Sequence, residues 1–337
     1  MKTILKFYAI MAMSVCLFMG CDKDDDNKDN NPPNVPQLLV TEVSNGTVIE
    51  SFQGNAMTEF NGKLWIAGGY ILGDSANGVG LYNSFNGSVW NEVFYSGTYL
   101  SGFAPSLTAF NNNLWFIGGL DNGGLPQSTI LKSANGEVWT TAVASAPFGG
   151  TAYHHTFVHN GKLFLVTGFQ SGTPTHNKVW STVDGENWTE ENAQAFPYRY
   201  ASSFVEFQNQ YYIVGGYDGS SYLNDVYKSA DGINWTNIAT SSNRFDPIAL
   251  HTTEEMNGKV WLIGGENNNA PTANLWYTIN MTDWYHYTTL PSGSRALKNH
   301  NTLKFLNGKI WIFGGESYNI STNLWEQESK IQTMEEL

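Results

Sequence analysis

The sequence predicts an all-β protein folded as a closed, six-bladed β-propeller. The first reason is a phrase that recurs six times: a short turn, an aromatic strand and a Gly-Gly pair, as in residues 61–69. The first residue of the pair falls at positions 68, 118, 167, 215, 264 and 314, and position 167 holds threonine instead of glycine. A period of about 50 residues marks a repeat architecture in which each repeat is one supersecondary unit.

A second pattern lies between the Gly-Gly pairs and divides each repeat into strands. It is an apolar pair, a two-residue turn and a tryptophan, as in Asp184-Gly185 before Trp188. Asn-Gly and Asp-Gly turns between apolar runs are strong hairpin signals. The fifth copy departs from the pattern, with Thr282-Asp283 ahead of its tryptophan. Each repeat is therefore expected to form four antiparallel strands, which is one propeller blade.

The two ends of the repeat region are predicted to complete each other. After the sixth Gly-Gly pair, Leu324-Trp325 is the expected third strand, and no later tryptophan marks a fourth strand. Counting back from the first repeat aligns residues 40–43 with a fourth strand. We therefore expect the N-terminal strand near residues 38–43 to join the last blade, which removes two open sheet edges.

The whole pattern resembles the kelch family over residues 38–330. The Gly-Gly pair, the aromatic pair and the late tryptophan occur in most copies. The resemblance implies a kelch-type six-bladed propeller, with residues 331–337 left as a C-terminal tail. The late tryptophans recur at one position of the repeat and are expected to pack in the core: Trp90, Trp139, Trp188, Trp235 and Trp284.

Composition and charge exclude several classes of function. The formal net charge is −13 with 17 Lys and Arg, so nucleic acid would be repelled and is not an expected partner. The two cysteines are Cys16 and Cys21, so the folded part has no disulfide, thiolate metal site or cysteine nucleophile. No stretch after residue 20 is long and apolar enough to span a bilayer.

Residues 1–20 are typical of an export signal. Two lysines precede a short apolar stretch that ends at Gly20. Phe18-Met19-Gly20-Cys21 resembles the lipobox of bacterial lipoproteins, in which the cysteine becomes the lipidated first residue. The alternative is an ordinary signal peptide with an incidental cysteine.

Residues 21–37 are expected to form a disordered tether, because they are acidic and proline-rich. An acidic stretch after the cysteine resembles the surface-export signal of Bacteroidetes lipoproteins, although it is also consistent with a plain charged spacer. We expect an outer-membrane, surface-exposed protein that contacts the membrane only through its lipid anchor.

Candidate ligand-binding residues gather on one face of the predicted ring. Because strand direction alternates within a blade, the tight turns lie on one face, and the long links lie on the other, here called the long-loop face. The three arginines of the chain, Arg199, Arg244 and Arg295, all fall in blade-to-blade links. Arginine suits carboxylate or phosphate ligands because its fork is planar and always charged.

The kelch resemblance implies that the basic residue at Arg199 faces the central channel, and Lys298 is placed in the same position of the repeat. The other candidates lie near the channel mouth: Tyr200, His154, His251, His300, Glu316, Tyr217 and Glu266. Together these residue types suit sugar recognition or acid–base chemistry. The alternative is that they merely line the channel and pair with one another.

Two enzyme families are weighed and set aside. Galactose oxidase has a kelch-like domain, but it needs copper and a tyrosine cross-linked to cysteine, and no cysteine follows Cys21. Residues 181–188 resemble the Asp-box of sialidases, but the nucleophile pair and the acid of those enzymes cannot be assigned. No cofactor and no metal site are expected.

A third enzyme family remains as an alternative. Residues 261–266 resemble the segment that carries the catalytic glutamate of sialic-acid mutarotases, so the resemblance implies Glu266 as the acid–base residue. That family's arginine shortly after the glutamate is absent from residues 267–272. The sequence therefore favours a non-catalytic module that binds a glycan or a protein partner through the long-loop face, with a mutarotase as the alternative.

Overall fold

A computed structural model of the chain divides it into two compact units, Met1–Asn34 and Val35–Leu337. All the residues that the structure describes belong to the second unit, so the predicted signal peptide, Cys21 and most of the tether lie outside them. The structure describes residues 35–43, 52–71, 80–97, 100, 102–171, 177–268, 270–271, 275–288, 297–298, 300–305, 308–319, 324–327 and 330–337.

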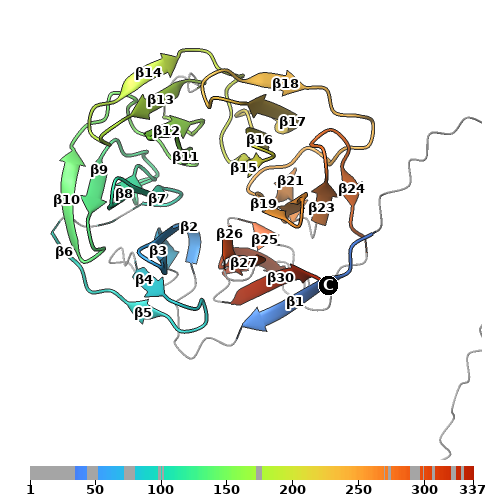
Figure 1. Cartoon of the computed structure of the whole chain (residues 1–337), viewed down its shortest axis with the longest axis horizontal. Coiled ribbons are helices and arrows are strands. Elements are labelled where there is room, and N and C mark those ends of the chain that lie inside the picture. The colour runs from blue at the N-terminus through green and yellow to red at the C-terminus, as the bar shows by residue number, and fades with distance from the viewer. Residues whose placement is uncertain are drawn as a thin grey trace, which may run out of the picture. The chain divides into compact units, whose positions relative to one another are not determined.

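The second unit is a ring of six antiparallel blades, and no helix occurs among its described residues (Figure 1). Five blades follow one another along the chain. Blade I holds β2 (Phe52–Phe60), β3 (Lys63–Ile71), β4 (Leu81–Ser84) and β5 (Asn91–Glu92). Blade II holds β7 (Ser106–Phe110), β8 (Asn113–Ile117), β9 (Ile130–Ser133) and β10 (Val138–Val143), with β6 (Ser96–Gly97) added parallel to β10.

Blade III holds β11 (His155–His159), β12 (Lys162–Val166), β13 (Val179–Thr182) and β14 (Thr189–Asn192). Blade IV holds β15 (Ser203–Phe207), β16 (Gln210–Tyr217), β17 (Tyr222–Ser229) and β18 (Thr236–Ile238). Blade V holds β19 (Thr252–Met256), β20 (Lys259–Ile263), β23 (Leu275–Thr278) and β24 (Tyr285–His286), and a small hairpin of β21 (Glu266–Asn267) and β22 (Ala270–Pro271) interrupts it.

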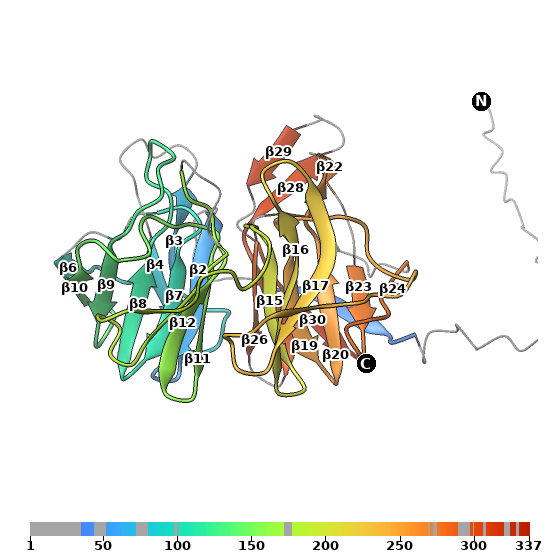
Figure 2. The ribbon, with the colours of Figure 1, turned by 90° about the horizontal axis from the view of Figure 1, so that it is seen from above.

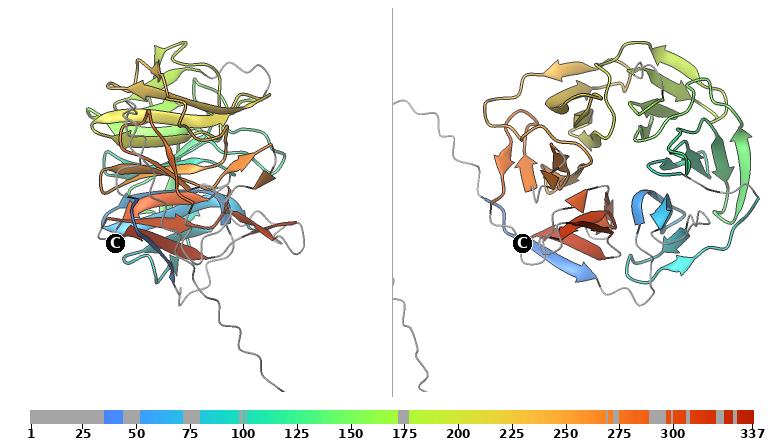
Figure 3. Two further views of the ribbon diagram at one scale, coloured as in Figure 1. Left: turned by 90° about the vertical axis from the view of Figure 1, so that its right-hand side faces the viewer. Right: turned by 180° about the vertical axis from the view of Figure 1, so that it is seen from behind.

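Blade VI closes the ring with strands from both ends of the propeller. It holds β26 (Asn301–Phe305), β27 (Lys309–Phe313), β30 (Ile331–Glu336) and β1 (Leu38–Val43). Strand β1 pairs along its whole length with β30, from Leu38 opposite Glu336 to Val43 opposite Ile331. Figure 3 shows the two strands side by side from behind the ring. The predicted closure by the N-terminal strand is thus confirmed.

The third strand of blade VI differs from the sequence-based expectation. Residues 331–336, expected to be part of a tail, form this strand and pair with both β27 and β1. Leu324-Trp325 instead belongs to β29 (Leu324–Gln327), which pairs with β28 (Glu316–Asn319). The reason is an inserted hairpin, which joins β25 (Leu297–Lys298) in a separate sheet. Figure 2 shows β22, β28 and β29 projecting together on one side of the ring.

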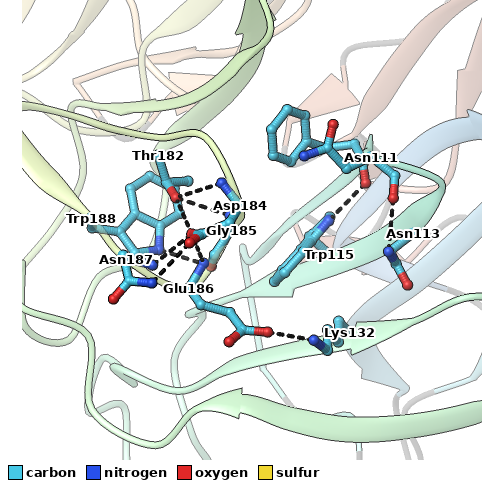
Figure 4. Close-up of polar contacts among 11 residues, drawn as sticks. Asn111, Asn113, Trp115, Lys132, Thr182, Asp184, Gly185, Glu186, Asn187 and Trp188 are labelled. Carbon is cyan, nitrogen blue, oxygen red and sulfur yellow. Dashed lines mark hydrogen bonds and ion pairs between the residues drawn. The ribbon is translucent and has the colours of Figure 1, made fainter.

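The turn before each late tryptophan is held by one repeated set of hydrogen bonds. In blade III, the Thr182 hydroxyl accepts from the Gly185 amide at 2.9 Å, and Asp184 accepts from the amides of Glu186 and Asn187 at 2.8 Å (Figure 4). The indole of Trp188 donates to the Gly185 carbonyl at 3.1 Å. These bonds satisfy amides of the turn that cannot take part in the strand-to-strand hydrogen bonds. They also hold the pKa of Asp184 well below its usual value, with the largest contribution from Asn187.

Blade V forms the same turn in a different register from the one predicted. Asn280-Met281, rather than Thr282-Asp283, occupies the Asp-Gly position, since Asn280 accepts from Thr282 and Asp283, and the Thr278 hydroxyl accepts from Met281. Met281 takes a φ of 65°, which glycine adopts more readily. Its fully buried side chain fills the adjacent core.

The hydrophobic core lies in the seams between blades. Each seam has its own cluster of buried residues, including the seam between blades VI and I, where Trp90 meets the Phe313 ring edge-on at 5.4 Å. The late tryptophans are all at most 9% exposed, which confirms their predicted place in the core. The turns also contribute, because a Cβ on Gly185 would lie 2.2 Å from Trp115 of the preceding blade.

The Gly-Gly pairs allow neighbouring blades to approach. A Cβ on Gly264 would lie 2.3 Å from the carbonyl oxygen of Leu297 and 2.8 Å from the His300 ring. The amide of the second glycine, Gly265, donates to that same Leu297 carbonyl at 2.6 Å. The repeated pair therefore positions the start of the next inner strand, where the candidate site lies.

None of the described residues forms a helix of the length and apolar character needed to cross a membrane.

Candidate functional site

A cavity of about 210 Å³ opens where the inner strands of the blades begin. Its rim is a ring of residues with left-handed backbone at one position of successive blades: Gly54, Ala104, Tyr153, Ala201 and Leu250, with φ between 52° and 63°. Amides of this ring donate to carbonyls of the preceding blade, as in Tyr153 to Ala104 at 2.9 Å and Leu250 to Ala201 at 2.9 Å. These interblade bonds hold a conformation that side chains normally disfavour, so the rim is rigid.

Histidines below this rim join the blades to one another. In each of four seams an imidazole Nε2 lies within hydrogen-bond distance of a hydroxyl from the neighbouring blade, at 2.9 to 3.2 Å. The pairs are Ser106 with His154, His155 with Ser202, Ser203 with His251, and Thr252 with His300. The predicted His154, His251 and His300 therefore line the cavity and also act as interblade connectors.

Burial keeps three of these imidazoles neutral, those of His155, His251 and His300. It lowers the pKa of His155 to about 4 and that of His300 to about 4. It also lowers the pKa of His251 to about 3, with a smaller contribution from the charges of His300 and His155. At neutral pH they act as hydrogen-bonding groups rather than as cations.

Arg199 does not face the cavity, which corrects its predicted role. Its side chain is fully buried, and its guanidinium binds both carboxylate oxygens of Asp225 at 2.6 and 2.9 Å. It also donates to the Gly215 carbonyl at 3.1 Å and lies 4.7 Å from the centre of the Tyr227 ring. The arginine is thus neutralised inside blade IV and is not available as a clamp for an anionic ligand.

Lys298 is not the counterpart of Arg199. In successive seams the second residue of the Gly-Gly pair, or of its Thr-Gly equivalent, donates its amide to a carbonyl at one fixed position of the next repeat. The bonds run from Gly168 to Arg199, from Gly216 to Ile248 and from Gly265 to Leu297. Leu297 is thus the equivalent position in blade VI, and Lys298 lies one residue further along on β25.

Lys298 belongs to a polar cluster together with Glu266, Glu316 and Tyr222. Its ammonium lies 2.8 Å from Glu266 Oε2 and 3.5 Å from Glu316 Oε2. The Tyr222 hydroxyl donates to Glu266 Oε1 at 2.9 Å. This cluster joins blades IV, V and VI on the long-loop face, and its one ammonium faces two carboxylates.

An aromatic surface adjoins this cluster. Tyr200 lies at its centre, in contact with the rings of Tyr217 at 5.6 Å, Phe169 at 5.3 Å and Tyr153 at 6.0 Å. Tyr198 adds a further ring at 6.0 Å from Tyr200. All five rings are only partly buried, and we call them the Tyr200 surface. Tyr222 contacts Tyr217 at 5.1 Å and thus connects this surface to Glu266.

The structure brings some predicted residues together and leaves others apart. Tyr200 and Tyr217 lie in the Tyr200 surface, and Glu266, Lys298 and Glu316 lie in the polar cluster. Arg244 is exposed elsewhere, in a link whose Asn243 carbonyl accepts from Trp284 of blade V. Arg295, like Cys21, lies outside the described residues.

Sequence reasoning missed Tyr153, Tyr198, Tyr222 and Asp225. Tyr153 occupies the rim position directly before His154, so the repeat spacing could have found it. Tyr222 and Asp225, both on β17, carried no comparable signal. Tyr222 reaches Glu266 of blade V, and Asp225 reaches Arg199 within blade IV, and no spacing in the sequence marks either contact.

Among the described residues, no group of three or more histidine, cysteine, aspartate or glutamate side chains is arranged to hold a metal ion.

The ring of blades, the Gly-Gly seams and the long-loop face define a six-bladed β-propeller of the repeat type. Residues 106–315 match the KLHDC2/KLHL20/DRC7 Kelch-repeats domain, and the chain belongs to the kelch-repeat family. Kelch propellers commonly mediate protein binding.

A solved structure with the same fold is described as "Structure of YjhT". It aligns with a TM-score of 0.61 and 16% sequence identity, covering 81% of this chain and 92% of that one. At this identity the likeness shows the fold alone. No curated protein matches the sequence.

Proposed function

We propose that this protein is a non-catalytic binding module that holds a partner on its long-loop face. The observation that carries the proposal is the Tyr200 surface, in which aromatic rings from blades III and IV lie side by side without being fully buried. Partly exposed tyrosines offer large, rigid contact area at little entropic cost, and they are enriched in protein interfaces. The kelch fold favours a protein partner, and a glycan could stack on the same rings.

Photo-crosslinking can test which face binds. Benzoylphenylalanine would replace Tyr217 in one variant and Asn209, in a tight turn on the opposite face, in a control variant. We expect cells illuminated with the Tyr217 variant to yield a defined adduct that the Asn209 variant does not yield. Adducts from Asn209 alone, or from neither position, would contradict the proposal.

A second candidate function is sugar mutarotation with Glu266 as the acid–base residue. The observation in its favour is the environment of this carboxylate, which is 8% exposed and bonded to both Tyr222 and Lys298. Such bonds fix a carboxylate in place for proton transfer. Arg199 cannot supply the arginine that the mutarotase resemblance requires, because Asp225 occupies it.

Proton NMR separates the two candidates. The protein would be mixed with a panel of reducing sugars that includes freshly released sialic acid. A mutarotase would accelerate anomer exchange, and Glu266→Gln would abolish the acceleration. Saturation transfer without exchange would indicate glycan recognition, and an absence of both would leave the protein-binding function.

We further propose that the propeller is tethered to the outer membrane through a lipid on Cys21 and faces outward. The support is the lipobox-like segment 18–21 and the acidic stretch that follows it. Labelled palmitate should be incorporated into the protein and lost in Cys21→Ser. Protease added to intact cells should remove the propeller, and protection from protease would contradict outward exposure.

A further inference from the structure

We propose that the Tyr200 surface receives a cationic side chain, arginine or lysine, from a partner protein. The inference rests on the proposed binding function and names the chemistry of the partner. It follows from two features of the long-loop face, an aromatic surface open to a cation and an excess of carboxylates around it.

The aromatic feature is built from blades III and IV. Tyr200 is surrounded by the rings of Tyr153, Phe169, Tyr198 and Tyr217, with centroids 5.3 to 6.0 Å away. The faces of aromatic rings carry negative potential and attract ammonium and guanidinium groups. The rings of this surface meet at interplanar angles of 48° to 85° and are only partly buried, so they gather aromatic potential from two blades at one place.

The first carboxylate beside these rings is Asp218, which directly follows Tyr217. Its Oδ1 accepts three hydrogen bonds, from the Ser220 amide and hydroxyl and from the Ser221 amide. Burial of Tyr200 raises the pKa of its phenol, and the charges of Tyr217 and Asp218 raise it further. Because Asp218 directly follows Tyr217 in the chain, its negative charge lies beside one ring of the Tyr200 surface.

The second source of negative charge is the polar cluster at the other end of Tyr222. Glu266 and Glu316 share the ammonium of Lys298, so among the described residues of this cluster the carboxylates outnumber the cations by one. The only arginine nearby, among residues that the structure describes, is Arg199, which Asp225 neutralises. The described part of this surface is thus acidic, which opposes the anionic ligand that the arginine positions had suggested and favours a cationic one.

Saturation-transfer NMR with short probe peptides tests the inference. The probes are a capped Gly-Arg-Gly peptide, the same peptide with citrulline in place of arginine, and a capped Gly-Glu-Gly peptide. Citrulline has nearly the shape of arginine but no charge. We expect the arginine peptide to bind at least tenfold more tightly than either of the others, and more weakly as salt is added.

Three variants locate the effect. Asp218→Asn keeps the Oδ1 acceptor of its turn and removes the charge, and Glu316→Gln removes a charge from the polar cluster. Each should weaken binding of the arginine peptide severalfold. The matched control is Glu190→Gln, which removes a carboxylate paired with Lys178 on the outer strand of blade III and should leave binding unchanged.

Equal binding of the arginine and citrulline peptides, preference for the glutamate peptide, or no binding of any peptide would each overturn the inference. So would equal losses in Glu190→Gln and Asp218→Asn. None of these results bears on whether the long-loop face binds a partner, because crosslinking from the Tyr217 position decides that separately.

Discussion

Arg199 carries its charge in the interior of blade IV, where its neighbours form hydrogen bonds and a cation–π contact with the guanidinium. Asp225 binds it through two hydrogen bonds, a backbone carbonyl accepts a third, and the Tyr227 ring covers its face. A buried charge with this geometry is strongly coupled to the fold, because removing one partner leaves the other without compensation. The residue therefore stabilises the scaffold beneath Tyr200 rather than the ligand.

We predict that Arg199→Ala lowers the free energy of unfolding by about 3 kcal/mol, the lower end of the range for broken buried pairs, because the Asp225 side chain is 31% exposed. Urea denaturation measures the loss. Arg244→Ala, which removes an exposed arginine, is the control and should change stability by less than about 0.5 kcal/mol. A similar small change in Arg199→Ala would show that the pair is not structural.

The three imidazoles with lowered pKa values predict how stability depends on pH. In the folded protein the pKa values of His155, His251 and His300 lie at about 3 to 4, below the value of 6.5 expected for an exposed histidine. Between about pH 4 and pH 6.5 the unfolded chain therefore binds more protons than the folded protein. The stability that neutral histidines provide is fully present above pH 6.5 and is lost as the pH falls toward 4.

Each imidazole should contribute a slope of up to about 1.4 kcal/mol per pH unit in that window. Unfolding midpoints measured from pH 7.5 to 4.5 test this prediction. His251→Gln can keep a hydrogen bond to Ser203 but cannot titrate, so its slope should be shallower than that of the wild-type protein. Parallel curves for the two proteins would contradict the assignment.

At the scale of the element, the late turn of each blade matters because it contacts the next blade. Gly185 has a φ of 83°, and a Cβ there would meet the Trp115 ring at 2.2 Å. Gly161, in the first turn of the same blade, also has a positive φ of 72° but has nothing within 4 Å. Substitutions at these two positions therefore distinguish the cost of backbone strain, which both share, from the cost of a steric clash, which only Gly185 would have.

We predict that Gly161→Ala costs only the backbone term, about 1–2 kcal/mol, whereas Gly185→Ala costs about 2–5 kcal/mol because overpacking is added. Thermal and urea unfolding of the two variants measure the difference. Equal losses would mean that the turn can move away from Trp115, and that the seam tolerates a side chain at this position.

The blade was predictable as an element because its signals are local. Turn chemistry and the alternation of apolar residues identify hairpins wherever they occur, and the period then counts the blades. The turn of blade V and the third strand of blade VI were predicted at the wrong residues, because in each case a neighbouring segment matched the repeat pattern equally well. Thr282-Asp283 precedes its tryptophan closely, and Leu324-Trp325 looks like a third strand, but Met281 takes the strained turn position and β30 takes the sheet.

At the scale of the whole molecule, closure depends on the pairing of β1 with β30. The two strands lie at opposite ends of the propeller sequence and complete one sheet. Their pairing leaves blade VI with four strands and buries Ile331 and Met334 in the seams beside blades I and V.

We predict that truncation after residue 330 abolishes cooperative unfolding or lowers the melting temperature by more than 10 °C, because β1 and β27 both lose their partner. Removal of Leu337 alone is the control and should have little effect, since this residue is exposed and follows the strand. Calorimetry measures both. An unchanged transition in the 330 truncation would show that these residues are a dispensable tail.

The site was less predictable than the fold, because it is assembled from several blades. The repeat positions placed His154 and His251 at the cavity, but they could not show that hydroxyls of neighbouring blades already bond them. They suggested that the arginines bind a ligand, but Asp225 on β17 binds Arg199, and no regular spacing in the sequence indicates this contact. The Tyr200 surface depends on the convergence of rings from blades III and IV, which only the three-dimensional structure supplies.

Hydrogen–deuterium exchange on the protein with and without its crosslink-identified partner tests the central claim most directly. The account predicts slower exchange in the bound state at residues 198–200, 217–222 and 266–268 on the long-loop face. It predicts no change at the tight turns 208–209 and 257–258. Protection confined to those turns would contradict the claim that this face of the propeller binds the partner.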